Sequence, residues 1–262
     1  MHDPIQRVAL CLSGVLIALC TVAVAAFPPR QSGETAPPGV NPPATGPGTT
    51  QGSQAAEVQE DFFDSAAFLG DSITLALRNY NLRTGALGKA TFLCAGSYSV
   101  RHAVNPEGLA ISYRGEEMSP QQALRESGAQ RVFIMLGMND LAFGLEEAME
   151  NWTVLIANIR KECPEMEIYI QSATPVYPSF EGKKLNNANL ELYNARLKSF
   201  AAQKGCVYVD VARYLKDENG ALAARYCSDR QCHLTESGVQ VWLRVLKEVA
   251  AGRKRRWRFF WR

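Results

Sequence analysis

A serine that follows a short apolar run is the first residue of this sequence that could do chemistry. Ser72 ends the stretch Gly70-Asp71-Ser72, directly after the apolar residues 66–69. If that run is a strand and a helix begins at Ser72, free backbone N–H groups and the positive helix end surround the hydroxyl. A serine nucleophile needs such a place, because an oxyanion forms beside it during acyl transfer. The alternative is that Ser72 only caps the helix, as Ser and Asp often do.

Two further apolar runs are followed by residues that could stabilise an oxyanion. Gly96 follows residues 91–93, and a glycine there lets its backbone N–H approach a ligand closely. Asn139 follows residues 131–136 and would place a side-chain amide in the same crevice. Each has an ordinary alternative, since a turn glycine or an Asn-Asp pair after a strand is common turn chemistry. We interpret Asp140 as a structural turn or cap residue.

The general base must be one of three histidines. His2 flanks an apolar segment, and His102 has no acid within several residues, so we interpret His102 as a surface or packing residue. His233 precedes a predicted helix and has Asp229 four residues upstream. A carboxylate beside a histidine fixes its tautomer and stabilises the imidazolium, which makes Asp229 the candidate for the third catalytic residue.

These candidates need a scaffold that brings the ends of the apolar runs together. Five short runs alternate with longer helical stretches, which predicts a doubly wound α/β domain with parallel strands buried on both faces. In such sheets the functional crevice lies beyond the carboxyl ends of the strands, where the candidates occur. The predicted strands are 66–69, 91–93, 131–136, 167–170 and 207–210, and the predicted helices are 73–79, 120–126, 145–162, 189–204 and 236–250.

Local signals support several helix ends. Ser119 followed by Pro120 and Gln122 predicts a capping box at a helix start. Thr235 can cap the last helix, and Gly205 is typical of a helix stop.

In this order, the four segments resemble the SGNH, or GDSL-type, hydrolase family. The resemblance covers residues 61–251, and its blocks are similar to Gly70-Asp71-Ser72, Gly96, Gly137-Met138-Asn139-Asp140, and Asp229 with His233. It implies a flavodoxin-like α/β/α sandwich with a five-stranded parallel sheet, and hydrolysis of esters or related acyl bonds. It also implies Ser72 as nucleophile, His233 as base, and an oxyanion hole built from the backbone of Ser72 and Gly96 with the side chain of Asn139.

The last block departs from the family pattern, which is usually D-x-x-H. Asp229 lies four residues before His233, and Arg230 occupies the usual position of the acid. If the turn absorbs the extra residue, Asp229 stays beside the imidazole. If it does not, a backbone carbonyl or another acid orients His233, and Asp210 at the end of the last predicted strand is the alternative.

Composition shifts divide the chain into four parts. Residues 1–27 form a membrane anchor or signal peptide, because the uncharged apolar run 8–27 has the length of a span while Ala23-Val24-Ala25 offers a cleavage site. Residues 28–57 are rich in Pro, Gly and Thr and predict a disordered linker, and the hydrolase domain occupies 58–252. We therefore expect a membrane-anchored protein with an extracellular catalytic domain, or a secreted one if the segment is cleaved.

The remaining residues, 253–262, form a basic tail with interleaved aromatic residues. The tail carries a charge of +6 against a formal net charge of +2, which leaves the rest of the chain at −4. Trp257, Phe260 and Trp261 would share a helical face, which favours binding to anionic lipid or wall polymer. A solvated tail is the alternative, and no nucleic-acid partner is expected outside the cell.

The cysteines and histidines do not indicate a metal centre. Cys227 and Cys232 next to His233 lack a fourth ligand of suitable spacing, so no metal and no other cofactor is expected. The irregular spacing of the cysteines is a poor disulfide framework, and we expect free buried thiols, with a Cys227–Cys232 bridge as the alternative.

Three functions remain. The first is an exported serine esterase acting on a small acyl ester or an acylated glycan of the extracellular space or cell envelope. The second is an O-acyltransferase of the same fold, and the third is a catalytically inactive carbohydrate-binding domain, which the presence of Ser72, Asn139 and His233 disfavours. Residues 105–118 and 174–184 are expected as loops at the mouth of the site, and they contain Tyr113, Tyr177 and Phe180.

Overall fold

A computed structural model of the chain describes residues 62–105 and 109–260, with the backbone only for 253–260. Its centre is a five-stranded sheet of order β2-β1-β5-β6-β7, in which all neighbouring strands are parallel. The predicted sheet is confirmed, and each strand ends within one residue of its predicted end. The strands are β1 (Ala66–Gly70), β2 (Thr91–Cys94), β5 (Arg131–Met135), β6 (Glu167–Gln171) and β7 (Val207–Val209).

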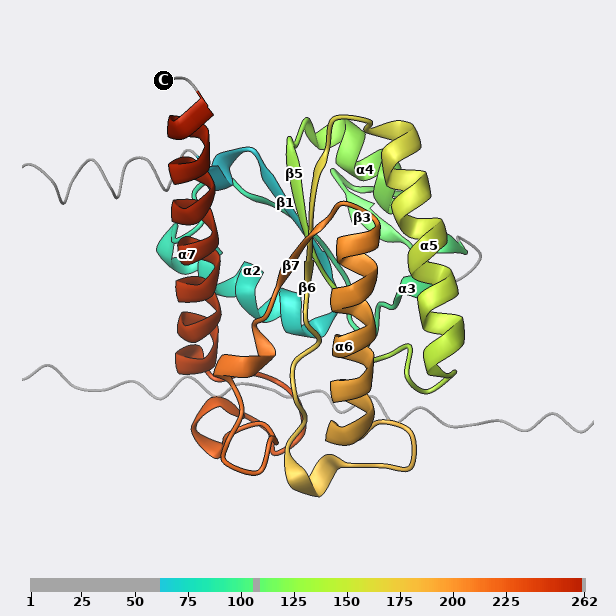
Figure 1. The fold of residues 1–262 in the computed structure, drawn as a ribbon, viewed down its shortest axis with the longest axis vertical. Helices are drawn as coiled ribbons and strands as arrows, with labels where there is room; N and C mark the ends of the chain where they lie inside the picture. The colour runs from blue at the N-terminus through green and yellow to red at the C-terminus, as the bar shows by residue number, and fades with distance from the viewer. Residues whose placement is uncertain (1–61, 106–108, 261–262) are drawn as a thin grey trace, which may run out of the picture. The chain divides into compact units, whose positions relative to one another are not determined.

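Helices cover both faces of this sheet (Figure 1). On one face lie α2 and α7, and on the other lie α4, α5 and α6, so the expected α/β/α sandwich is confirmed. The reversal of strand order falls between β1 and β5, which is where ligands bind in open sheets of this kind. The helices are α2 (Ser72–Thr84), α4 (Pro120–Ser127), α5 (Leu145–Glu162), α6 (Asn187–Gln203) and α7 (Glu236–Phe260).

Side-chain caps explain where several helices begin. Ser119 and Gln122 form the predicted capping box at the start of α4. The Thr235 hydroxyl accepts a hydrogen bond from Gly238 N at 3.2 Å, as expected for the cap of α7. Asp71, not Ser72, caps α2, because its Oδ1 accepts from Ile73 N at 2.9 Å. Ser72 is therefore the first helical residue, and its interpretation as the cap is wrong.

The structure differs from expectation in four places. Helix α2 continues from its predicted end at residue 79 to Thr84, where Gly85 in the left-handed conformation caps it. Residues 105–118 are not simply a loop, because β3 (Ile111–Tyr113) and β4 (Glu116–Met118) form a small antiparallel hairpin. A short helix, α3 (Val100–Val104), follows β2. Helix α7 continues from its predicted end at residue 250 to Phe260, into the basic tail. Strands of three residues and a helix of five are too short to produce a periodic pattern that a sequence can reveal.

The predicted anchor or signal peptide at 1–27 and the linker at 28–57 lie outside the described residues. Within the described part, no helix combines the length and the apolar character that crossing a membrane requires. The side chains of the tail also lie outside it, so the predicted binding of lipid or wall polymer stays a prediction.

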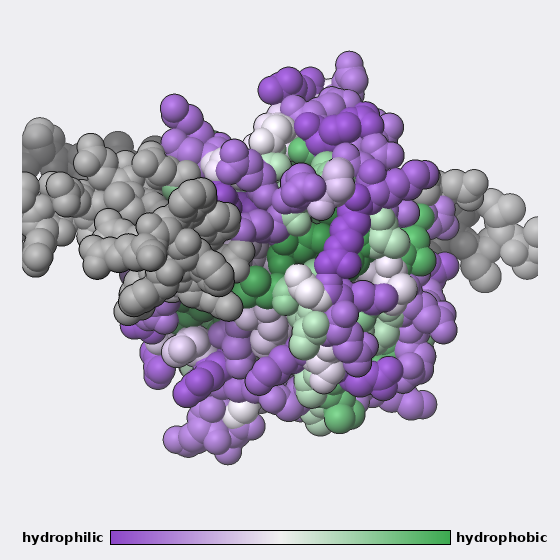
Figure 2. Space-filling model, turned by 45° about the horizontal axis from the view of Figure 1, so that its top comes forward, coloured by the Kyte–Doolittle hydropathy of each residue, from purple (hydrophilic) through white to green (hydrophobic). Residues whose placement is uncertain are grey.

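Seven large apolar side chains of the described residues are exposed. Polar and charged side chains cover most of the face in Figure 2, with apolar ones gathered towards its middle. Single exposed apolar residues are ordinary on soluble domains and do not define a partner surface. The exposed large ones are Leu82, Leu109, Phe143, Val154, Phe180, Leu192 and Tyr214.

A buried chain of hydrogen bonds ties two helices to the end of β5. Tyr193 of α6 donates to the carbonyl of Leu136 at 2.9 Å, and Trp152 Nε1 of α5 donates to the Tyr193 hydroxyl at 2.6 Å. Gly137 follows with φ +129, and a β-carbon there would lie 2.1 Å from the Tyr193 ring. The tyrosine therefore requires glycine at this position, and the pair fixes where the turn that carries Asn139 begins.

We expect Tyr193→Phe to lower the free energy of unfolding by about 2–3 kcal/mol. The variant leaves Trp152 N–H and the Leu136 carbonyl without this partner in the core, and each unsatisfied buried group costs roughly 1–3 kcal/mol. Urea unfolding measures the loss, and Tyr214→Phe on the surface is the matched control, with a change within about 0.5 kcal/mol. Equal stability of the two variants would contradict the anchoring role.

Candidate active site

Ser72, His233 and Asp229 form one continuous line of hydrogen bonds. His233 Nε2 lies 3.1 Å from Ser72 Oγ, and His233 Nδ1 lies 2.6 Å from Asp229 Oδ2. The serine begins α2 after β1, and the other two precede α7. Both distances fall within hydrogen-bond reach for a nucleophile, its base and the group that orients the base. The arrangement can move a proton from the hydroxyl to the imidazole.

The turn between Asp229 and His233 accommodates the extra residue. Arg230 adopts a left-handed conformation with φ +58. Asp229 Oδ1 accepts hydrogen bonds from the backbone N–H groups of Gln231, Cys232 and His233 at 2.8, 3.2 and 3.3 Å. One carboxylate oxygen therefore holds the turn while the other contacts the imidazole.

The alternative acid, Asp210, lies elsewhere. Its Oδ1 accepts from Arg213 N at 3.2 Å at the start of the short helix η2 (Ala212–Tyr214). The acid hydrogen-bonded to His233 is Asp229, so the structure favours the first of the two arrangements that the sequence left open.

The environment of Asp229 favours its ionised form. Partial burial raises its pKa, but the hydrogen bonds from His233 and from the backbone N–H groups outweigh burial, and the pKa lies below its ordinary value. The Asp229 side chain is 29% exposed and that of His233 is 43% exposed. The base is therefore open to solvent and paired with an anion, which can stabilise the imidazolium that proton transfer creates.

The two backbone donors that the sequence predicts for an oxyanion hole are the N–H groups of Ser72 and Gly96. Among the described residues, no acceptor is hydrogen-bonded to the backbone N–H of Ser72 or of Gly96. A β-carbon on Gly96 would meet no atom within 4 Å, so open space adjoins that residue. Both amides can therefore donate to a bound oxyanion.

The third predicted donor is already engaged. Asn139 Nδ2 donates to the carbonyl of Tyr98 at 2.9 Å and to Asp71 Oδ2 at 3.2 Å. A carbonyl can only accept, so the contact with Tyr98 establishes which end of the amide carries the hydrogens. The structure thus brings Asn139 to the end of β1, with both amide hydrogens directed at protein acceptors.

Asp71 is the group that sequence reasoning missed. It is 3% exposed, and burial is the main cause that raises its pKa to about 7. Its two oxygens accept from Ile73 N and from Asn139 Nδ2. The contact with Ile73 could have been predicted, because Asp is a preferred helix cap. No local sequence pattern indicates the contact with Asn139.

Asp140 and His102 have structural contacts that agree with their interpretation from the sequence. The Asp140 carboxylate accepts from Val100 N at 3.0 Å and from Arg101 N at 3.1 Å, at the start of α3. His102 Nδ1 lies 2.9 Å from Ser99 Oγ, and its ring stacks on Tyr98. Neither carboxylate nor ring belongs to the line of hydrogen bonds at Ser72.

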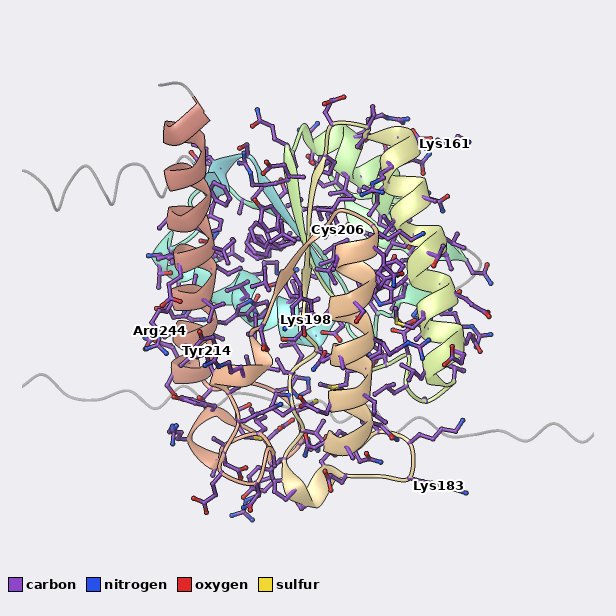
Figure 3. All side chains as sticks on the ribbon, in the orientation of Figure 1. Lys161, Lys183, Lys198, Cys206, Tyr214 and Arg244 are labelled. Carbon is purple, nitrogen blue, oxygen red and sulfur yellow. The ribbon has the colours of Figure 1, made fainter. Side chains whose placement is uncertain are left out.

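The segment 174–184 borders the site on two sides. Tyr177 N donates to the carbonyl of Gln231, at 2.7 Å, in the turn that carries Asp229. Lys184 Nζ donates to the carbonyl of Ala142, at 2.6 Å, in the turn that follows Asn139. Lys183 points away from the domain into solvent (Figure 3). Tyr113, in contrast, lies on β3 of the hairpin.

The five cysteines of the described residues are free thiols. Cys227 Sγ lies 3.6 Å from Asp229 Oδ1, and burial raises the pKa of the Cys232 thiol to about 12. The bridge between them that the sequence left open is not formed.

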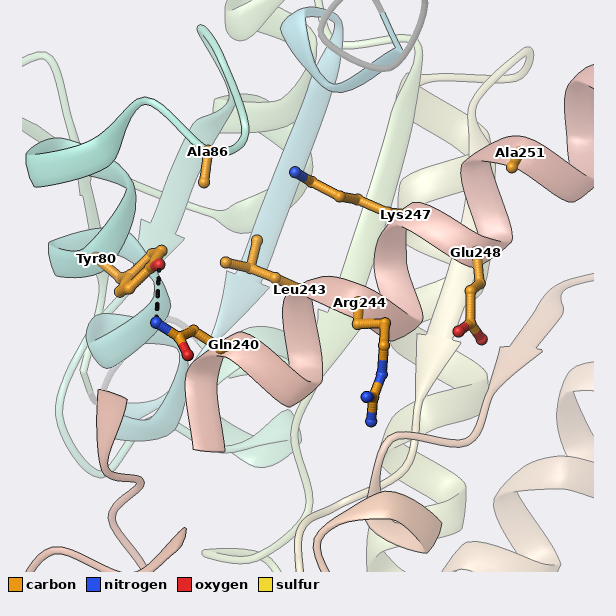
Figure 4. Close-up of a pocket in the computed structure, with 8 residues that line it drawn as sticks. All are labelled: Tyr80, Ala86, Gln240, Leu243, Arg244, Lys247, Glu248 and Ala251. Atoms are coloured by element: carbon orange, nitrogen blue, oxygen red, sulfur yellow. Dashed lines mark hydrogen bonds between the residues drawn. The ribbon is translucent and has the colours of Figure 1, made fainter. Parts of the chain in front are cut away.

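A hollow of about 450 Å³ lies between α2 and α7, away from these residues (Figure 4). None of Ser72, Asp229 and His233 lines it, so we do not assign it to the candidate chemistry. Its lining consists of Tyr80, Ala86, Gln240, Leu243, Arg244, Lys247, Glu248 and Ala251.

The raised pKa of Asp71 predicts a pH-dependent contribution to stability. Because folded Asp71 binds a proton more readily than the unfolded chain does, its contribution is present below its ordinary pKa of 3.8 and is lost as pH rises through about 7. Between pH 5 and pH 8 we expect the free energy of unfolding to fall less in Asp71→Asn than in the wild type, by about 2–3 kcal/mol. Urea unfolding at both pH values tests this, and an identical pH dependence in the two proteins would contradict it.

The model of the GDSL-like lipase/acylhydrolase family matches residues 68–241. The comparison with curated proteins gave no match. Among solved structures, the chain is similar to a GDSL-like lipase from Bacteroides thetaiotaomicron, with 15% identity over 76% of this chain and 95% of that one and a TM-score of 0.57. It is also similar to a protein described as an acylhydrolase from Bacteroides fragilis, with 16% identity over 71% of this chain and 86% of that one and a TM-score of 0.57. A third similar structure is an acetyl xylan esterase, with 13% identity over 70% of this chain and 98% of that one and a TM-score of 0.50.

At these identities the solved structures show a shared fold only. The family match itself spans more than half of the chain, from β1 into α7, and includes both Ser72 and His233. This chain therefore belongs to the GDSL-like lipase/acylhydrolase family.

Proposed function

We propose that this chain is an exported serine esterase that cleaves acyl esters with Ser72 as nucleophile, His233 as base and Asp229 as the acid that orients the base. The observation that carries the proposal is the line of hydrogen bonds from Asp229 through His233 to Ser72, at 2.6 and 3.1 Å. Membership of an acylhydrolase family supports the same reaction class.

Acylation begins when His233 Nε2 takes the proton of Ser72 Oγ as this oxygen attacks the acyl carbonyl. The carbonyl oxygen becomes an oxyanion, and in this proposal the N–H groups of Ser72 and Gly96 donate to it. Each donor of this kind stabilises the transition state by about 3 kcal/mol. The Asn139 amide is the third donor. Its hydrogen that points to Asp71 is shared between that carboxylate and the oxyanion.

The same groups complete acylation and then carry out deacylation. The His233 imidazolium, held by Asp229, protonates the leaving alcohol, and the acyl group stays on Ser72. Water then enters, loses a proton to His233 Nε2 and attacks the acyl carbonyl. The bond between the acyl carbon and Ser72 Oγ then breaks, His233 returns the proton to that oxygen, and the acid is released. The open, partly exposed setting of His233 supports direct entry of this water.

The substrate we propose is an O-acyl group on an extracellular or cell-envelope polysaccharide. The apolar run at 8–27 and the Pro-rich segment after it support export and a spacer between the domain and a membrane. A similar fold in a protein described as an acetyl xylan esterase makes acetyl esters the first substrates to test. Tyr177 and Phe180, on the segment that borders the site, could stack on a sugar ring.

The decisive experiment is hydrolysis of p-nitrophenyl acetate and butyrate by the full chain. We expect Ser72→Ala and His233→Ala each to lower kcat by roughly 10⁴-fold or more, and Asp229→Asn by about 10³-fold, because these residues act as a unit. The matched controls are Ser199→Ala, at an exposed serine, and His102→Ala, at a partly buried histidine outside the line of hydrogen bonds, and both should retain wild-type turnover. Release of acid into water distinguishes the esterase from an acyltransferase, and turnover that survives Ser72→Ala would refute the mechanism.

A second variant tests the backbone donor at Gly96. A methyl group there meets no protein atom, so Gly96→Ala should fold with unchanged stability, yet the methyl group narrows the approach of the acyl oxygen to the N–H. We expect kcat/KM to fall about tenfold or more, by loss of part of one oxyanion contact. Gly252→Ala, near the end of α7 and equally unobstructed, is the control. Unchanged kcat/KM in Gly96→Ala would place the acyl oxygen elsewhere.

A further inference from the structure

We infer that Asp71 is a positioning residue that fastens the Asn139 amide to the start of α2 and so fixes two oxyanion donors relative to each other. The inference rests on the proposed function, because it concerns the donors of that reaction. It assigns a role to a carboxylate that the proton transfer itself does not use.

Asp71 accepts two hydrogen bonds, one on each carboxylate oxygen, and we call this pair of hydrogen bonds the Asp71 clamp and each bond an arm of it. Asp71 Oδ1 accepts from Ile73 N at 2.9 Å and holds the first turn of α2, which includes the N–H of Ser72. Asp71 Oδ2 accepts from Asn139 Nδ2 at 3.2 Å, across 68 residues of sequence. One carboxylate thus joins the end of β1 to the turn after β5.

A third segment completes the arrangement. The carbonyl of Tyr98, which follows β2, accepts the other hydrogen of Asn139 Nδ2 at 2.9 Å. The two acceptors together set the rotation of the amide. The contact with Asp71 is the longer and weaker of the two, so the hydrogen that points to Asp71 is the one that can also bond to an oxyanion. Preorganised donors of this kind need no rearrangement at the moment of reaction.

Burial and neighbouring charges set the strength of the clamp. Both arms are hydrogen bonds to the carboxylate as acceptor, so the ionised form makes them best, whereas burial opposes ionisation. The charge of Asp140 also raises the pKa, and that of His233 lowers it. Formation of the His233 imidazolium therefore favours ionised Asp71 at the step in which the oxyanion develops. The titratable groups that interact with Asp71 are Asp140, His233, Cys94, Tyr193 and Cys232.

The test is a double-mutant cycle between Asp71 and Asn139 in the full chain, with p-nitrophenyl acetate as substrate. Asp71→Asn keeps the size and the helix cap, since Asn caps helices as well as Asp, but turns a donor towards Asn139. We expect it to lower kcat about 10- to 100-fold with KM within about twofold, and Asn139→Ala to lower kcat about 10²- to 10³-fold. The double variant should be no slower than Asn139→Ala, because Asp71 acts through that residue.

Additive losses in the cycle would overturn the inference, since Asp71 would then act on Ser72 independently of Asn139. Ser119→Ala is the matched control for the loss of a helix cap: it removes the cap of α4 and should lower stability while kcat stays unchanged.

A second measurement needs no turnover. The side-chain amide signals of Asn139 in a ¹⁵N-resolved NMR spectrum can be assigned by their absence in Asn139→Ala. We expect them to shift with a midpoint near pH 7 in the wild type, to shift with a somewhat higher midpoint in His233→Ala, and to lose this titration in Asp71→Asn. Signals that titrate equally in Asp71→Asn would overturn the clamp. A wild type without esterase activity would instead contradict the proposed function, which the NMR result does not depend on.

Discussion

The parallel pairing of β1 with β5 determines where Ser72 and Asn139 lie relative to each other. Gly70 pairs with Met135, so both strands end side by side at the point where the strand order reverses. The approach is so close that a β-carbon on Gly70 would lie 1.9 Å from Thr74 Oγ1 and 2.9 Å from the Met135 carbonyl. The turn into α2 and the turn after β5 therefore emerge next to each other, and a serine and an amide distant in sequence become neighbours.

The fold then places two carboxylates in opposite environments within this small region. Asp229 lies on a partly exposed turn among N–H donors, which stabilise its charge and lower its pKa. Asp71 lies under the first turn of α2, where loss of water outweighs its two hydrogen bonds. The exposed acid can stabilise a charge that appears on the base, and the buried acid can hold neutral donors in place.

The sequence predicted what depends on local pattern and on strand-end placement. The five strands and the bounds of α5 follow from continuous apolar runs and helical periodicity, and the approach of Asn139 to the residue before Ser72 follows from parallel topology. The hairpin at 111–118 and the helix α3 were missed, because elements of three to five residues carry no periodicity. The contact between Asp71 and Asn139 was missed for another reason: it joins residues 68 apart, and only the packed sheet determines its geometry.

The turn before α7 contains a left-handed residue, Arg230, and the carboxylate that stabilises this turn also orients the catalytic imidazole. An L-residue such as Arg230 adopts φ +58 at a cost of roughly 1–2 kcal/mol, and the three backbone hydrogen bonds to Asp229 Oδ1 offset that cost. The same carboxylate carries the imidazole on its other oxygen. Protonation of Asp229 at low pH would weaken both its hydrogen bond to the imidazole and its hydrogen bonds to the backbone of the turn. Loss of the imidazole's orientation and loosening of this turn would then be two descriptions of a single equilibrium.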